Sequence, residues 1–272
     1  MRRAGTIMLL ALVAGCATDS APAVPPSSPP VATSVVASPA AGPLDLATRG
    51  PAADAFARAR GGTTGIAVRD RVTGRSWGNR AARTPFRAAS TVKLAIAVDL
   101  LGRARAGAVR LTAADRAALR AMLVRSDNAA TDRLWARFGG AAIGSRFPAY
   151  GLVSATRTDA WDQVRCTPED LLRLVGHVLD RVHPTDRATL VDLLRAVEPA
   201  QRWGVFGVVG TGRPGGKNGW LPTGAGWAVA TAGFVGPGER YAVAVMTTGA
   251  PDFVAGVETV TGTVTTLLLG VS

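Results

Sequence analysis

Residues 86–98, FRAASTVKLAIAV, decide how the rest of the chain is interpreted. A polar Ser-Thr pair opens an apolar run, which predicts a helix with Ser90 in its first turn. Lys93 follows three residues later, and residues three apart share one face of a helix. A hydroxyl and an amine there can act as nucleophile and base, because the N–H groups at a helix N-terminus favour developing negative charge. Taken alone, however, S-x-x-K is a common pattern that more often marks a serine cap followed by a solvated lysine.

Lysine is rare in this chain. Of its 31 lysines and arginines, only Lys93 and Lys217 are lysines and the other 29 are arginines. Arginine stays protonated in proteins, whereas a desolvated lysine can lose its proton and act as a base. The two lysines are therefore candidates for chemistry that needs an amine, although two chance survivors of a biased composition would give the same count.

The apolar pattern around this stretch predicts a hairpin, a block of helices, three further strands and a last helix. This order indicates an α+β fold, in which the two β segments form one antiparallel sheet of about five strands, flanked by helices and an all-helical subdomain. The hairpin is expected over 65–78 and the late strands over 215–221, 226–234 and 240–247. Helices are expected at 51–60, from 90, at 112–124, 129–138 and 141–150, from 167, and at 184–197 and 251–269.

The first 44 residues have the composition of an export signal and a tether. Met1-Arg2-Arg3 precedes a short apolar run that is too short to span a membrane, and VAGC at 13–16 resembles the lipobox of bacterial lipoproteins. Residues 1–16 are therefore predicted to be a lipoprotein signal with Cys16 as the lipidated residue. Residues 17–44 are rich in Ala, Pro and Ser and predict a disordered tether. The folded domain is expected over 45–272, held on the outer face of the bacterial cell membrane.

Composition and scattered residues exclude several other classes of protein. The net charge of +12 comes from arginines spread along the chain, without basic runs interleaved with aromatics, so we expect no nucleic-acid partner. His177 and His183 lack the companions of a metal site and are interpreted as structural or surface residues. Cys166 is expected to be a small buried hydrophobe. We expect a monomer with no metal or other cofactor.

Two further short motifs accompany the first. SDN at 126–128 ends the helix predicted at 112–124, and KNG at 217–219 opens the first late strand. Together with STVK at 90–93, they resemble the S-x-x-K, S-D-N and K-T-G motifs of class A serine β-lactamases and the related penicillin-binding proteins. Each motif is weak alone, but their order and their places on a helix start, a loop and a strand match this family over residues 45–272.

The resemblance implies a role for each motif residue. Ser90 would attack an amide or lactam carbonyl, with Lys93 as a neutral base or as a relay through water. The backbone N–H groups of Ser90 and Trp220 would form the oxyanion hole, and Ser126 would pass a proton to the leaving nitrogen. Asn128 would hold both Lys93 and the substrate's side-chain amide, and Lys217 would attract the substrate's carboxylate. Substrate binding would thus involve Asn128, Lys217, Asn218, Gly219 and Trp220.

The chain departs from the family pattern at two places. Asn218 stands where Thr or Ser is usual, so an amide replaces a hydroxyl that contacts the substrate. TRTDAWD at 156–162 resembles the beginning of the loop that carries a catalytic glutamate in class A enzymes, with Asp162 in the glutamate's place and the rest of the loop abridged. Aspartate is one methylene shorter, and a misplacement of about 1 Å can cost roughly a hundredfold in rate. Asp162 is equally interpreted as a carboxylate that stabilises the loop.

Three functions follow from these observations. The first is an exported, lipid-anchored serine hydrolase that opens β-lactam rings through an acyl-enzyme on Ser90. The second, favoured by the abridged loop, is an enzyme that cleaves D-Ala-D-Ala peptides or esters and releases β-lactams slowly. The third is a non-enzymatic lipoprotein that retains the fold.

Overall fold

The computed structural model describes residues 44–208, 210 and 212–270. The predicted signal at 1–16, its Cys16 and the tether up to residue 43 lie outside the described residues. Leu44, the first residue described, is buried, and its backbone N–H donates to the Tyr241 hydroxyl at 3.4 Å. None of the helices in the described part is long and apolar enough to cross a membrane.

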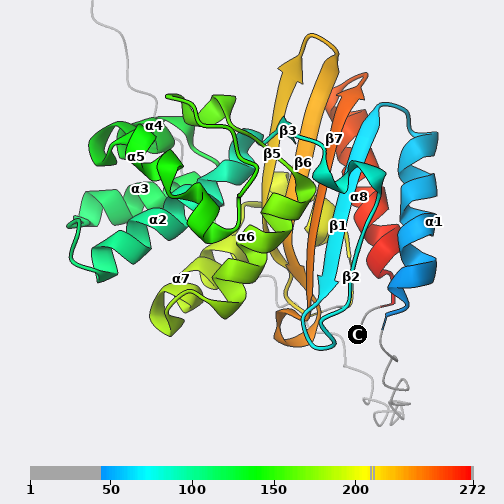
Figure 1. Ribbon diagram of the computed structural model, residues 1–272, viewed down its shortest axis with the longest axis horizontal. Coiled ribbons are helices and arrows are strands. Elements are labelled where there is room, and N and C mark those ends of the chain that lie inside the picture. Colours follow the sequence, from blue (N-terminus) through cyan, green and yellow to red (C-terminus); the bar gives the residue numbers. More distant parts are fainter. Residues whose placement is uncertain (1–43, 209, 211, 271–272) are drawn as a thin grey trace, which may run out of the picture. The chain divides into compact units, whose positions relative to one another are not determined.

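One antiparallel sheet of five strands organises the described residues, as the sequence predicted (Figure 1). Its order is β2-β1-β7-β6-β5, so the early hairpin pairs with the last strand and β5 forms one edge. The late strands form the predicted meander, with Lys217 opposite Ala232 in the β5–β6 register. The strands are β1 (Thr63–Asp70), β2 (Ser76–Gly78), β5 (Gly215–Thr223), β6 (Gly226–Val235) and β7 (Tyr241–Ala250). A separate two-stranded ladder joins β3 (Phe86–Arg87) to β4 (Arg165–Cys166).

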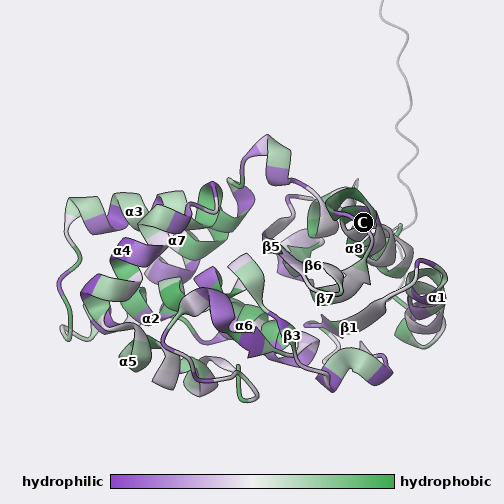
Figure 2. Cartoon of the chain, turned by 90° about the horizontal axis from the view of Figure 1, so that it is seen from above, coloured by the Kyte–Doolittle hydropathy of each residue, from purple (hydrophilic) through white to green (hydrophobic). Residues whose placement is uncertain are grey.

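Helices cover both faces of the sheet and form an all-helical region beside β5 (Figures 1 and 2). The α-helices are α1 (Leu46–Ala59), α2 (Lys93–Arg105), α3 (Ala113–Val124), α4 (Asn128–Phe138), α5 (Gly140–Ser145), α6 (Pro168–Asp180), α7 (Pro184–Arg195) and α8 (Phe253–Leu268). The 3-10 turns are η1 (Arg80–Arg83), η2 (Ala89–Val92), η3 (Phe147–Tyr150), η4 (Trp161–Gln163), η5 (Pro199–Gln201), η6 (Gly204–Gly207) and η7 (Pro237–Glu239). Capping boxes at Thr112 and Thr167 start α3 and α6 where the sequence predicted.

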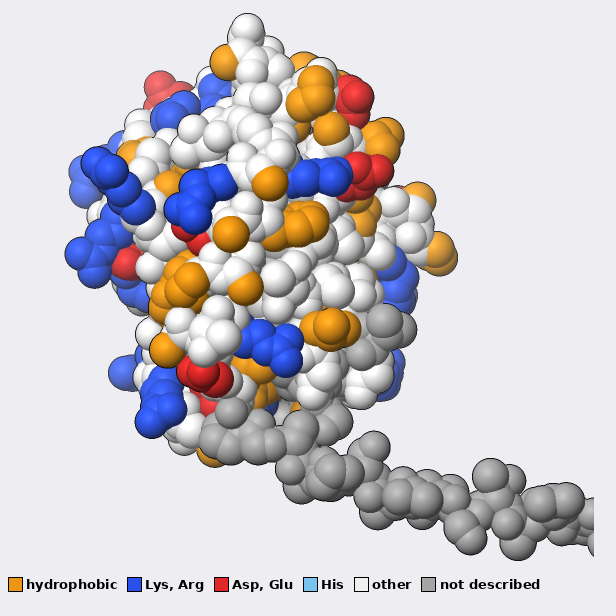
Figure 3. Space-filling view, turned by 90° about the vertical axis from the view of Figure 1, so that its right-hand side faces the viewer, with side chains coloured by type: hydrophobic (Ala, Val, Ile, Leu, Met, Phe, Trp, Pro, Cys, Tyr) orange, Lys and Arg blue, Asp and Glu red, His pale blue; other side chains and the backbone are white. Residues whose placement is uncertain are grey.

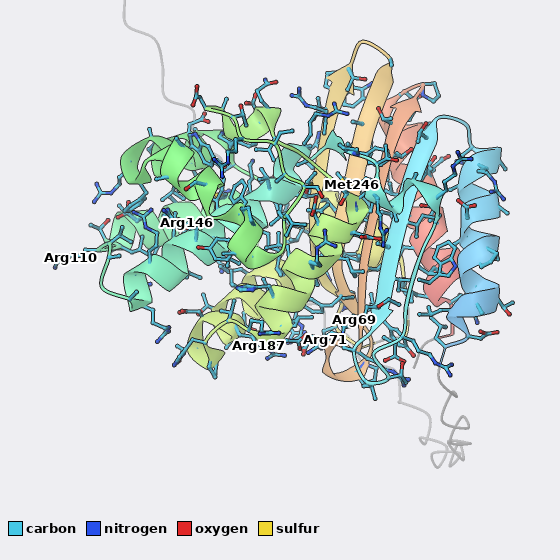
Figure 4. The ribbon with its side chains drawn as sticks, viewed as in Figure 1. Arg69, Arg71, Arg110, Arg146, Arg187 and Met246 are labelled. Carbon is cyan, nitrogen blue, oxygen red and sulfur yellow. The ribbon has the colours of Figure 1, made fainter. Side chains whose placement is uncertain are left out.

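Alternation along the central strands divides the core into two clusters. On β7, Val243 and Val245 pack with α1 and α8, whereas Ala244 and Met246 pack with the helices on the opposite face. Successive side chains of a strand point to opposite faces, so both faces of this strand are buried. Met246 lies in the middle of the sheet in Figure 4, and none of its surface is exposed.

Ion pairs account for many of the arginines. Arg187 and Arg195 on α7 both bind the carboxylate of Glu239 in the β6–β7 turn, at 2.6 and 2.7 Å. Arg71 pairs with Asp180 at the end of α6 at 2.6 Å, near Arg187 in Figure 4. On the face that Figure 3 shows, arginines lie among acidic and apolar side chains and do not form one dense patch. Arginine therefore connects elements of the fold here.

Several boundaries differ from the sequence prediction, and three of the differences have a clear local cause or bear on the site. Helix α1 begins at Leu46, five residues before Pro51, because Asp45 caps it by accepting the N–H of Ala47. The helix expected over 141–150 is divided into α5 and η3, since Pro148 lacks the N–H that a continuing helix needs. Ser90 lies in the 3-10 turn η2, and the α-helix starts only at Lys93.

Candidate active site

Ser90 lies where a strained turn meets the edge of the sheet. Ala89, the residue before it, has a φ of 48°, a left-handed conformation that is rare outside glycine and is found mainly at functional sites. Gly219 on β5 lies against this turn, because a Cβ at that position would be 2.7 Å from the Ser90 backbone nitrogen. Only glycine lets the strand approach so closely. The third motif therefore lies directly beside the first.

Lys93 points into the protein. Its side chain is fully buried, and Nζ donates to the Ser126 carbonyl at 2.7 Å and to Asn128 Oδ1 at 2.6 Å. The Trp161 ring covers the amine, with Nζ 4.6 Å from the ring centroid. The Asn128 contact that the resemblance implied for Lys93 is therefore present, and the amine is held by two segments of chain, residues 126–128 and Trp161.

Ser126 connects the two lysines. Its hydroxyl accepts a hydrogen bond from Lys217 Nζ at 2.9 Å and a longer one from Lys93 Nζ at 3.4 Å. Ser126 has a φ of 57°, so it too occupies the left-handed region that non-glycine residues avoid. Lys217 is buried and also donates to the carbonyl of Asn218 at 2.7 Å. Residues far apart in sequence thus converge around one hydroxyl.

Burial shifts the pKa of both amines. Neither amine forms an ion pair with the residues the structure describes, so no adjacent carboxylate cancels that shift. Burial lowers the pKa of Lys93 to about 8, although the charges of Asp127 and Asp132 act to raise it. Burial also lowers the pKa of Lys217 well below its usual value, and the nearby charge of Lys93 lowers it further, while Glu198 acts in the opposite direction. A lysine with a pKa of about 8 has a neutral fraction at physiological pH that can accept a proton, and burial favours the neutral form of Lys217 as well.

Asn218 faces the other side of β5. Its Nδ2 donates to the carbonyls of Gln201 and Trp203 at 2.8 and 3.0 Å, and the side chain is buried. Both N–H groups of the amide are thus used inside the protein and are not available to a substrate. Of the side chains in this motif, that leaves Lys217 to bind one. The next residue, Trp220, packs its ring against Trp203 and Phe253 at centroid distances of 6.0 and 5.7 Å.

Asp162 is not part of this network. It lies in η4 with an exposed side chain, and its carboxylate forms no hydrogen bond or ion pair with the residues the structure describes. Its backbone carbonyl accepts from Arg87 at 2.9 Å. The polar partners of Lys93 are Ser126 and Asn128, so the Asp162 carboxylate makes no contact with the lysine. Nothing in the contacts of its carboxylate stabilises the loop either.

Asp132 and Trp161 were not singled out from the sequence. Trp161 covers Lys93, and its Nε1 donates to Asp132 Oδ1 at 2.7 Å. Both line a cavity of about 390 Å³ together with Asn128 and Asp162. Asp132 lies four residues after Asn128 and on the same face of α4, and this spacing was the signal available in the sequence.

The remaining candidates have structural surroundings. His177 packs against the Tyr150 ring at 5.4 Å, and His183 caps α7 by accepting the N–H of Thr185. Cys166 is fully buried as predicted, and burial raises the pKa of its thiol. Among the described residues, no group of three or more His, Cys, Asp or Glu side chains is placed to hold a metal ion.

Comparison with known families agrees with this arrangement. Residues 51–116 and 114–268 match the model of the beta-lactamase enzyme family. The chain belongs to the beta-lactamase enzyme family. The match includes all three motifs and the whole five-stranded sheet, so the α+β fold and the family that the motifs indicated are both confirmed.

Relatives are found among both sequences and solved structures. A Mycobacterium tuberculosis H37Rv protein named "Putative lipoprotein LppW" is 33% identical over 257 residues, covering 89% of this chain and 79% of that protein. The beta-lactamase from Sphaerobacter thermophilus is 24% identical with a TM-score of 0.71, covering 83% of this chain and 97% of that one. An ancestral class A beta-lactamase is 23% identical with a TM-score of 0.70, covering 81% and 98%. At these identities the structures are evidence for the fold alone.

Proposed function

We propose that this chain is an exported, lipid-anchored serine hydrolase that opens the β-lactam amide through an acyl-enzyme on Ser90. The observation that carries the proposal is the hydroxyl of Ser126, which lies within hydrogen-bond distance of both buried amines. Two lysines on the surface, each paired with a carboxylate, would not both donate to one serine hydroxyl. The lipid anchor at Cys16 is supported by the lipobox-like VAGC and by the name of the mycobacterial relative.

Acylation needs a base, a proton donor and a site for negative charge. Neutral Lys93 takes the proton of Ser90 directly or through water, the Ser90 Oγ–carbon bond forms, and the carbon–nitrogen bond of the lactam breaks. Ser126 gives a proton to the leaving nitrogen and regains one from a lysine. The N–H groups of Ser90 and Trp220 hold the developing oxyanion, and the closeness of Gly219 to Ser90 supports this arrangement.

Lys217 and Asn128 bind the substrate in this proposal. A substrate carboxylate beside Lys217 would offset the burial of its amine and restore the charge, because a nearby opposite charge favours the protonated form. Asn128 is exposed, and its Nδ2 forms no hydrogen bond with the described residues, so this group can meet the side-chain amide of the substrate.

A second candidate differs in its substrate and in how fast it releases a β-lactam acyl group. It is an enzyme acting on D-Ala-D-Ala peptides or esters, in which a β-lactam acyl group stays on Ser90 for a long time. The exposed carboxylate of Asp162, without a contact to Lys93, favours this candidate, since hydrolysis of the acyl-enzyme needs a base held against the attacking water.

Intact-mass spectrometry of the purified protein with benzylpenicillin tests both candidates. We expect one adduct per protein molecule, absent in Ser90→Ala and present in the control Ser145→Ala, which changes an exposed serine in α5. An adduct lifetime of seconds or less supports hydrolysis as the function, and a lifetime of hours supports the second candidate. The absence of any adduct, with no turnover of a reporter ester that depends on Lys93, would leave the non-enzymatic lipoprotein.

A further inference from the structure

A second cavity adjoins the candidate site on the far side of Gly219. It has a volume of about 580 Å³ and is lined by residues from the β5–β6 hairpin, by Phe86 and Arg87 of β3, and by Arg165 of β4. Arg87 comes three residues before Ser90, and Leu221 comes two residues after Gly219. Since a strand rises about 3.3 Å per residue, Leu221 is roughly 7 Å from the point where β5 meets Ser90.

The direction in which β5 runs past Ser90 indicates which part of a substrate would lie in this cavity. Lys217 lies two residues before Gly219 along the strand and donates to the Ser126 hydroxyl, so these two groups would receive the leaving nitrogen and its carboxylate. The acyl portion, which stays on Ser90, must then extend the other way, along Leu221 toward the hairpin. The cavity is therefore an acyl-side pocket, an assignment that rests on the proposed function.

Two arginines give this pocket its charge. Arg87 and Arg165 are directly opposite each other in the β3–β4 ladder, so their side chains share one face of it. Arg87 donates to Gln163 Oε1 and to the Asp162 carbonyl, both at 2.9 Å, and Arg165 donates to the Pro85 carbonyl at 2.7 Å. Among the residues the structure describes, neither guanidinium forms an ion pair, and no Asp or Glu lines the pocket.

This arrangement costs stability in the free protein. Like charges directly opposite in a ladder repel, and most buried polar atoms have a hydrogen-bond partner. The Nε of Arg87 is nevertheless buried without an acceptor among the described residues. A carboxylate entering the pocket would offset the repulsion between the two guanidinium groups, because a charge-assisted contact to arginine is favourable.

We propose that the pocket formed by Arg87 and Arg165 is a specificity subsite for substrates whose acyl portion carries a carboxylate. Phe86, Leu221 and Pro222 supply apolar walls for the rest of the acyl group. The two ends of the substrate are then recognised separately, with Lys217 at the leaving side and the arginine pair at the acyl side.

Equilibrium binding to the unreactive Ser90→Ala protein tests this subsite without requiring acylation. The probes are benzylpenicillin and carbenicillin, which differ by a carboxylate on the acyl side chain. A charge-assisted hydrogen bond is worth enough to predict about tenfold tighter binding of carbenicillin. Adding Arg165→Gln should remove most of that preference, and Arg165→Lys, which keeps the charge, should retain part of it.

The matched control is Arg110→Gln, which removes the same charge from an exposed arginine at the far end of the helical region (Figure 4). It should leave the carbenicillin preference unchanged. Equal affinity for the two compounds, no detectable binding of either, or a preference that survives Arg165→Gln would overturn the subsite. Failure of the proposed function would be detected in a different experiment, as the absence of a benzylpenicillin adduct on the unaltered protein.

Discussion

The two sides of the candidate site are built differently. The strand side, Lys217 and Asn218 of β5 with Ser126, consists of side chains fixed by hydrogen bonds, and the two residues on β5 are each only 1% exposed. The loop side, residues 156–164, is held by its backbone carbonyls at Asp159 and Asp162, which accept from Trp135 and Arg87, and by the side chains of Trp161 and Gln163. The Asp162 side chain remains exposed.

This difference separates the two halves of the proposed reaction. Groups that stabilise developing charge are effective when surrounding structure fixes them before the reaction begins. The strand side meets this condition, and it holds the groups proposed for acylation. The loop side fixes its backbone but leaves free the carboxylate that would serve deacylation. We therefore expect substitutions on the strand side and at Lys93 to have large effects and those on the loop carboxylate to have small ones.

The largest effect is expected from Lys93→Met, which keeps the length of the side chain and removes the base. Loss of a general base typically costs about 10²–10⁴-fold, so we expect the acylation rate by benzylpenicillin to fall by roughly 10³-fold. Rapid-quench mass spectrometry measures this rate directly. A rate within tenfold of the unchanged protein would show that Lys93 is not the base.

Asn218→Ala and Asp162→Ala compare how much a side chain on each side of the site contributes to the free energy of unfolding. Asn218→Ala leaves the carbonyls of Gln201 and Trp203 without their donor in a buried place, which should lower the free energy of unfolding by about 2 kcal/mol. The matched change on the loop side, Asp162→Ala, removes an exposed side chain and should change it by less than about 0.5 kcal/mol. Urea denaturation measures both, and similar losses would contradict the difference between the sides.

The pH dependence of acylation tests the electrostatics of Lys93. Its pKa is about 8, and only the neutral amine accepts a proton, so the rate should rise by roughly tenfold between about pH 7 and pH 9. Asp132 acts to raise that pKa, and Asp132→Asn should therefore move the rising limb to lower pH. A rate that falls over this range, or a limb that moves to higher pH, would contradict this assignment.

The smallest effect is expected from Asp162→Asn. Because the carboxylate has no contact with Lys93, the deacylation rate should change by less than about threefold, well short of the effect of removing a general base. The lifetime of the benzylpenicillin adduct measures it. A lifetime prolonged a hundredfold would show that the loop closes over the acyl-enzyme and brings Asp162 to the water.

The sequence predicted the features that depend on local patterns. The apolar pattern placed the strands and the starts of α3 and α6, and the scarcity of lysine pointed to Lys93 and Lys217. It did not predict contacts that depend on packing. Trp161 covers Lys93, a contact that only the folded loop creates, and the inward direction of the Asn218 amide depends on the carbonyls of residues 201 and 203. The Arg87–Arg165 pair required the register of a two-residue ladder.

Peptide mapping after exposure to benzylpenicillin tests most directly whether residues 90, 93 and 217 form one acylation site. We predict that the acyl group is found on Ser90, that Ser145→Ala acquires it at the same rate, and that Lys93→Met and Lys217→Met both fail to acquire it in the same time. An acyl group on another residue, or undiminished labelling of Ser90 in Lys217→Met, would contradict the account.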